Sequence, residues 1–309
     1  MTTTVSRAIV VLVLCAILPL TGGGASDAAQ KVRVVTTISD LKALTEAVGG
    51  DLVDVESLTR GTQNFHDAEV RPSMMLKLRR ADLLVENGLA LDAWVDVAIQ
   101  GANNGNLVRG APGRIEAARG VPLLDVPTGR VDRSMGDVHP HGNPHVTLDP
   151  GAAPVITRNI AAGLAAVAPS HRAAFEKNRE AFLAKLDGEM ARWSKMMEPV
   201  RGAKVVVYHP TFAYFLARFG LVQAGTVEDR PGIPPSPAHL ARLIQQMRGE
   251  KVKAVLVEPW SDRKLAERVA QEAGARAVVV APAVGAVPGA DTYLAAVDYN
   301  IRTLADVLK

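Results

Sequence analysis

The sequence predicts an α/β fold with two βα-type domains, each built on a parallel sheet, joined by a long rigid inter-domain helix. With 309 residues, the chain is long enough for two domains of ordinary size. Valine-rich runs alternate along it with segments whose apolar residues recur at helical spacing, which is typical of parallel βα units. Residues 171–197 keep helical periodicity and would form a helix about 40 Å long at 1.5 Å per residue. A helix of that length would cross both halves of the molecule.

Residues 1–28 are predicted to be a cleavable export signal. The lone basic residue Arg7 precedes an apolar run over residues 8–20, and small residues follow, with cleavage expected after Ala25 or Ala28. The apolar run is short for a helix that spans a bilayer, although an uncleaved anchor is the alternative. The mature protein is therefore expected in the periplasm.

The chain has a single cysteine, Cys15, which lies within the apolar run of this signal. A lipoprotein signal would place a small residue directly before that cysteine, but Leu14 stands there, so a lipoprotein is the less favoured outcome. The mature chain then has no cysteine, which excludes disulfides and thiolate metal sites and leaves histidine and carboxylates as metal ligands. The net charge is +3 and the sequence has no basic block, which argues against nucleic-acid binding.

An N-terminal α/β metal-binding domain is predicted over residues 29–150. Its strands are expected at 31–37, 51–59, 82–88 and 121–127, and its helices at 38–50, 73–81 and 91–102. A linking helical region follows over residues 151–200, with a break at Pro169 and with Ser170 as the expected N-cap of the long helix. Asp149 is expected to cap the start of this region through the first helical N–H groups.

A C-terminal α/β domain is predicted over residues 201–309. Its strands are expected at 203–209, 221–227, 252–259 and 276–282, and its helices at 210–220, 236–251, 261–275 and 292–309. Ser236 and Asp291 are the expected N-caps of two of these helices.

Three histidines occupy positions where ligands bind in open parallel sheets, at or beyond the carboxyl ends of strands. His209 ends a predicted strand, His66 lies in the loop after another, and His145 lies just before the linking helices. Each of them alone would more often be a solvated loop histidine. Because they are far apart in the sequence, only the fold can bring them together.

Four segments that contain or follow these histidines resemble those of a known family. They are NFHDAEVRPSMMLKLRRADLLVENGLALDAWV (64–95), NPHVTLDP (143–150), VVVYHPTFAYFLARFGL (205–221) and KVKAVLVEPWSDRKLAERVAQEAGA (251–275). In these segments the chain resembles the ABC-transporter solute-binding proteins that capture zinc or manganese outside the cytoplasmic membrane. The resemblance covers nearly the whole mature chain and implies a non-enzymatic protein that delivers metal to a membrane permease.

The resemblance implies that His66, His145 and His209 are metal ligands. The family commonly adds an aspartate in a loop before the last helix, but Ala281 stands at that position in this chain. The fourth ligand is therefore open. Glu258 is the first candidate because it ends a predicted strand, Glu228 is the second, and water is the third. Glu258 is equally well explained as a group that hydrogen-bonds a ligand imidazole.

Neutral imidazole suits zinc, whereas manganese favours more oxygen ligands, so Zn²⁺ is the expected transported ion and Mn²⁺ the alternative. A manganese- or iron-binding homologue is thus one alternative function. A secreted zinc hydrolase is another, because three histidines with an open position also hold catalytic zinc, although no HExxH motif is present. A surface adhesin or a metal buffer without a transporter is a third.

Two more histidines, His139 and His141, precede the Asn-Pro-His segment in a short loop. They are expected either to capture zinc transiently and pass it to His145 or to be solvated. The expected partners are an ABC-transporter permease and, as a further possibility, a periplasmic zinc donor protein. The protein is expected to be a monomer whose stiff linking helix allows only small closing movements.

Overall fold

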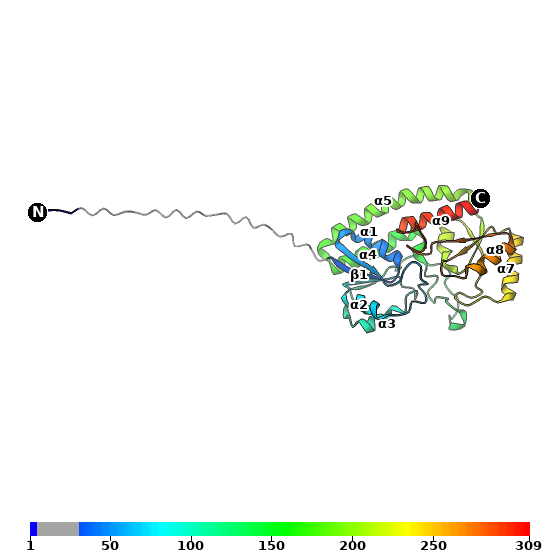
Figure 1. The fold of residues 1–309 in the computed structure, drawn as a ribbon, viewed down its shortest axis with the longest axis horizontal. Helices are drawn as coiled ribbons and strands as arrows, with labels where there is room; N and C mark the ends of the chain where they lie inside the picture. Colours follow the sequence, from blue (N-terminus) through cyan, green and yellow to red (C-terminus); the bar gives the residue numbers. More distant parts are fainter. Residues whose placement is uncertain (5–30) are drawn as a thin grey trace. The chain divides into compact units, whose positions relative to one another are not determined.

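Two four-stranded parallel sheets organise the region from Lys31 to Lys309 (Figure 1). The structure is a computed structural model, and it describes residues 1–4 and 31–309. The predicted export signal, Cys15 included, lies outside the described residues except for the first four. In the described part of the chain, no helix is both long enough and apolar enough to cross a membrane.

The first sheet has the strand order β2-β1-β3-β4, with every neighbouring pair parallel. Its strands are β1 (Val32–Thr36), β2 (Val53–Ser57), β3 (Leu83–Glu86) and β4 (Arg114–Glu116). The helices of this half are α1 (Ser39–Gly49), α2 (Pro72–Arg80) and α3 (Val95–Ala102). Strand β3 is buried at all four positions, as expected for a strand in a parallel sheet that is covered on both faces.

The second sheet repeats this pattern with the order β6-β5-β7-β8. Its strands are β5 (Lys204–Val207), β6 (Val222–Thr226), β7 (Ala254–Val257) and β8 (Arg276–Val279). Its helices are α6 (Ala213–Phe219), α7 (Pro237–Glu250), α8 (Arg263–Ala273) and α9 (Tyr293–Val307). The predicted fold class, two parallel-sheet α/β halves with a long connecting helix, is confirmed. The predicted domain boundaries near residues 150 and 200 stay a prediction.

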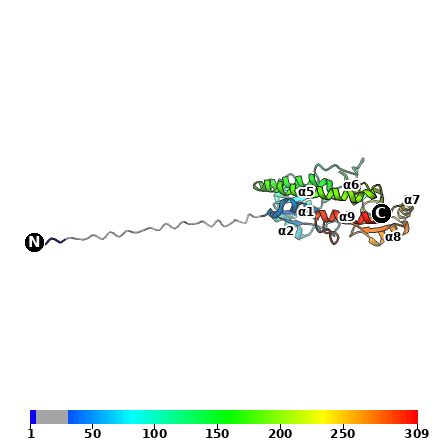
Figure 2. The same ribbon diagram turned by 90° about the horizontal axis from the view of Figure 1, so that it is seen from above.

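The long helix α5 (Arg172–Met197) follows α4 (Ala153–Val167) and connects the two halves. It contacts α1 and α4 beside the first sheet and α9 beside the second (Figures 1 and 2). Its 26 residues correspond to about 39 Å at 1.5 Å per residue. Trp193 near its end is fully buried and donates its indole N–H to Asp298 of α9 at 3.0 Å. The apolar core continues from one sheet to the other beneath this helix.

A second connection between the halves centres on Asp40, a buried residue of α1. Its Oδ1 accepts the backbone N–H of Val284, in the loop before α9, at 2.7 Å. Its Oδ2 accepts the hydroxyl of Thr147 at 3.0 Å, and the hydroxyl of Ser39 donates to the Val284 carbonyl at 2.7 Å. We call these contacts of Ser39, Asp40, Thr147 and Val284 the Asp40 junction. It fixes the first half against the second close to the segment that carries His145.

Three details of the sequence interpretation are wrong. Residues 121–127 form no strand, because Pro122 and Pro127 lack the N–H groups that a sheet ladder needs, and the short β4 takes the edge of the sheet instead. Two caps also differ: Thr292, rather than Asp291, caps α9 by accepting the N–H of Ala295, and Ser170 makes no capping bond to α5. The predicted cap Ser236 is confirmed, since its hydroxyl accepts the N–H of His239.

Candidate metal centre

Three loops at the carboxyl ends of the two sheets carry the three histidines. His209 follows β5 by two residues and directly precedes a short 3₁₀ turn, Pro210–Phe212. His145 precedes another turn, Val146–Leu148, at the approach to α4. His66 lies in the loop between β2 and α2. The fold thus brings residues from both halves to one place. This agrees with the expectation that ligands of open parallel sheets bind at the carboxyl ends of the strands.

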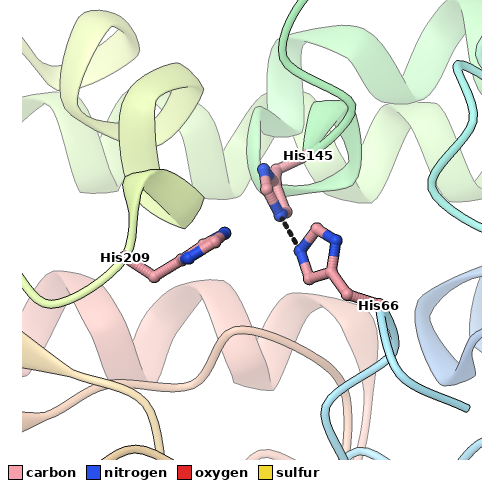
Figure 3. Close-up of side chains that lie close together, drawn as sticks. All are labelled: His66, His145 and His209. Carbon is pink, nitrogen blue, oxygen red and sulfur yellow. Dashed lines mark hydrogen bonds between the residues drawn. The ribbon is translucent and has the colours of Figure 1, made fainter. Parts of the chain in front are cut away.

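The three imidazole rings converge on one point (Figure 3). One nitrogen from each ring belongs to a set whose members all lie within 4.8 Å of one another. The Nε2 atoms of His66 and His145 are 3.0 Å apart, and the ring centres of His66 and His209 are 5.1 Å apart. His145 and His209 are 5% and 8% exposed, so the cluster is largely withdrawn from water.

Hydrogen bonds orient two of the rings. The Nδ1 atom of His145 lies 2.7 Å from Oδ1 of Asn143, an acceptor, and Nδ1 of His209 lies 2.8 Å from a carboxylate oxygen of Glu228. Each partner favours a proton on Nδ1, which leaves the lone pair of Nε2 directed at the cluster. Such partners commonly fix the tautomer and raise the basicity of a metal-ligating histidine.

Burial also keeps two of the three rings neutral. It holds the pKa of His66 and of His145 well below the ordinary value, and the nearby ring of His209 lowers both further. Neutral imidazole is the form that ligates a metal. Three rings with converging nitrogens, two of them kept neutral by burial, can therefore hold one divalent ion, with room in its coordination shell for a further ligand.

Similarity to known proteins identifies the family of this chain. The profile of the family described as zinc-uptake complex component A, periplasmic (ZnuA), matches residues 34–307. The chain belongs to this family. Its solute-binding, metal-binding character follows from that membership.

Individual members of the family are distant relatives. The high-affinity zinc uptake system protein ZnuA of Bacillus subtilis is 27% identical over 263 residues, which is 84% of this chain and 81% of that protein. The manganese ABC transporter substrate-binding lipoprotein PsaA of Streptococcus mitis is 27% identical over 85% of this chain and 82% of its own length. A crystal structure of ZnuA has a TM-score of 0.77 at 25% identity and covers 91% of this chain and 100% of the other. The names of these relatives thus refer to different ions, zinc for the Bacillus subtilis protein and manganese for the Streptococcus mitis protein.

An aromatic wall closes one side of the cluster in this ZnuA-family chain. The buried ring of Phe65 lies 5.2 Å from that of His66 and 5.8 Å from that of His145, measured between centres. Trp260 packs edge-on against Phe65 at 5.4 Å, and Trp94 donates its indole N–H to the Phe65 carbonyl at 3.1 Å. The side chains of this wall offer no ligand atom on that side.

The predicted ligand Glu258 lies outside the set of three histidines. It is 1% exposed, and its two carboxylate oxygens accept the hydroxyls of Thr211 at 2.8 Å and Ser261 at 3.0 Å. Burial raises the pKa of this carboxyl. Its role as a metal ligand stays a prediction.

The other positions considered for the fourth ligand have different surroundings. Glu228 accepts from both His209 and the backbone N–H of Gly232, so in this arrangement it supports a histidine. Ala281 is buried, and its backbone exchanges two hydrogen bonds with the amide of Asn300. The sequence interpretation missed the roles of Asn143 and Phe65, although both stand next to or near a predicted ligand in the segments that carry the family resemblance.

Asp149 has the capping role that the sequence predicts. One of its oxygens accepts the N–H of Gly151 at 2.7 Å, and the carboxylate also forms a two-pronged ion pair with Arg218 of α6, at 2.6 and 2.7 Å. Asp149→Ala is expected to lower the free energy of unfolding by about 1–2 kcal/mol, mostly through the lost cap. It should also weaken metal binding, because His145 lies four residues upstream.

Urea denaturation and metal titration would measure both effects. Asp149→Asn is the matched control, since its side-chain oxygen can still cap but the ion pair with Arg218 is lost. Unchanged stability and unchanged metal affinity in Asp149→Ala would contradict the role.

Proposed function

We propose that this protein captures Zn²⁺ in the periplasm with His66, His145 and His209 and delivers it to the membrane permease of an ABC transporter. The observation that carries the proposal is the convergence of three imidazole nitrogens within 4.8 Å, in a set that contains no carboxylate. Imidazole suits zinc, whereas manganese favours sites richer in oxygen ligands. The zinc-uptake name of the Bacillus subtilis relative supports the same choice, and the manganese name of the Streptococcus mitis relative defines the alternative.

Metal analysis and calorimetry test the proposal. Protein purified without chelator should contain zinc, and titration of metal-free protein should give one site with a much higher affinity for Zn²⁺ than for Mn²⁺. Equal affinities for the two ions would contradict the choice of zinc. The absence of any zinc binding would contradict the proposal as a whole.

The pH dependence of zinc binding should follow the lowered pKa values of two ligands. Protons compete with zinc for imidazole, so affinity falls where the ligands become protonated. Because the pKa values of His66 and His145 lie well below 6.5, their protonation, and the loss of affinity it causes, is displaced to lower pH. Calorimetry from about pH 5 to 8 should therefore show affinity declining towards the acid end, with release of fewer than three protons per zinc.

A loss of affinity below pH 6.5 as steep as three histidines of ordinary pKa would give would contradict the lowered pKa values of His66 and His145. Release of three protons at pH 6.5 would contradict the lowered pKa values. Buffers with different ionisation enthalpies give the number of protons released.

We further propose that the bound metal is cargo rather than a catalyst. Glu258, the base that a hydrolase would need, has both oxygens committed to Thr211 and Ser261. The zinc-loaded protein should hydrolyse generic ester and peptide substrates no faster than the His209→Ala variant. Faster hydrolysis by the wild-type protein would favour the hydrolase alternative. The proposal also includes a periplasmic zinc donor protein as a further partner. It describes the zinc-binding protein itself as a monomer.

A further inference from the structure

The segment of residues 132–142, here called the strap, lies beside the three-histidine cluster and is fixed to the second half of the molecule. The backbone N–H of Asp137 donates to the carbonyl of Pro231 at 2.8 Å, and Arg230 donates to the carbonyl of Ser134 at 3.1 Å. The strap therefore contacts the loop that follows Glu228, the residue that orients His209.

Two glycines allow this close approach. Gly136 and Gly232 both have φ of 75°, a backbone region that favours glycine. A Cβ atom on Gly136 would lie 2.1 Å from the Pro231 carbonyl oxygen, and one on Gly232 would lie 2.1 Å from a carboxylate oxygen of Asp137. Space requires glycine at Gly136, where the contact is with backbone, and the positive φ favours glycine at both positions.

The strap carries His139 to the edge of the cluster. The ring centre of His139 lies 5.2 Å from that of His66, close to the 5.0 and 5.1 Å that separate His66 from the other two histidines. His139 lines the same cavity of about 250 Å³ as His145 and His209. Its neighbour in the strap, His141, is exposed.

One ring nitrogen of His139 lacks a hydrogen-bond partner within the described residues. Its Nε2 atom is buried and has no hydrogen-bond partner there. A buried polar atom without a partner costs about 1–3 kcal/mol, so such atoms commonly mark a functional position. A bound metal would satisfy this nitrogen.

Two carboxylates near the cluster, those of Glu228 and Glu258, already accept hydrogen bonds, and Asp137, which lines the same cavity as His139, lies outside the set of ligand atoms within 4.8 Å of one another. Glu228 accepts from His209 and Gly232, and Glu258 accepts from Thr211 and Ser261. We propose that His139 is the fourth ligand of the transported ion, which is then held by four imidazoles. This inference rests on the proposed function, since it completes the coordination shell of the same metal.

Ligation requires a small movement of His139. Its nitrogens lie outside the set in which all ligand atoms are within 4.8 Å of one another. The adjoining cavity gives the ring space to turn, while the contacts of Asp137 and Ser134 hold the rest of the strap in place. A fourth nitrogen also favours zinc over manganese, because it fills with nitrogen a position that manganese would prefer to fill with oxygen.

The test compares wild-type protein, His139→Ala and His141→Ala, each titrated with Zn²⁺ and Mn²⁺ and examined by X-ray absorption at the zinc edge. The wild type and His141→Ala should show four imidazole nitrogens at about 2.0–2.1 Å, and His139→Ala should show three. Zinc affinity should fall about tenfold or more in His139→Ala, a loss that even an indirect metal-site partner can cause. Manganese affinity should change much less. The ratio of zinc affinity to manganese affinity should therefore fall in His139→Ala and stay unchanged in His141→Ala.

The possible failures are distinguishable. If the wild type binds zinc with three imidazoles, and His139→Ala behaves like His141→Ala, the fourth-ligand inference is overturned while the proposed function stands. If the wild type binds no zinc, both are overturned. Thermal unfolding of the metal-free proteins checks that His139→Ala is folded. If His139→Ala loses zinc affinity and manganese affinity equally, His139 has a structural role and the inference is overturned.

Discussion

His145→Ala is expected to bind zinc at least about 100-fold more weakly than the wild type, beyond the loss caused by removing an indirect partner of a metal site. His145 is the most deeply buried of the three histidines, and its Nε2 lies 3.0 Å from that of His66. Its removal would leave only His66 and His209 of the three converging rings. Competition against a chelator of known affinity measures the change.

A histidine elsewhere in the protein provides the control for this variant. His171, at the start of α5, packs against Phe175 at a ring distance of 6.2 Å and lies outside the cluster. His171→Ala should keep the zinc affinity of the wild type. Full affinity in His145→Ala would show that the metal binds elsewhere.

The second large effect concerns stability. Arg114 of β4 and Glu86 of β3 form a two-pronged ion pair at 2.8 and 2.6 Å, and their side chains are 4% and 3% exposed. Arg114 also reaches Asp96 of α3 at 2.7 Å. Arg114→Met would leave the charge of Glu86 buried without compensation, so we expect the free energy of unfolding to fall by about 3–5 kcal/mol.

Urea denaturation of the metal-free protein measures this change. The control is the exposed pair of Lys204 and Glu250, 2.9 Å apart, where Lys204→Met should cost at most about 1 kcal/mol. The double variant Glu86→Leu/Arg114→Met should recover part of the lost stability, because it removes both charges. A loss in Arg114→Met no larger than in Lys204→Met would contradict the prediction.

Periodicity predicted most of the fold because the core positions follow it. The buried strands β3, β5 and β7 are runs of apolar residues, and α5 is continuous over the predicted range. Strand β4 escaped prediction because its three residues, Arg-Ile-Glu, have no apolar pattern, and Arg114 is buried only through its pairing with Glu86.

The candidate site was predictable only in part. The strand-end rule and the family resemblance selected His66, His145 and His209, which the structure brings together. Glu258 satisfied the same rule, but its carboxylate is turned to two hydroxyls through contacts with Thr211 and Ser261. The positions of Phe65 and His139 depend on packing between segments far apart in the sequence, and no local pattern encodes that packing.

The Asp40 junction constrains how far the two halves can move apart. Because Asp40 of the first half bonds Val284 of the second, and the core continues beneath α5, wide separation of the halves would break buried contacts. Dissociation therefore has to proceed through local movement of the loops around the cluster. The dissociation rate constant, rather than the association rate constant, should then be the quantity that a docked permease changes, by displacing those loops while the two sheets keep their places.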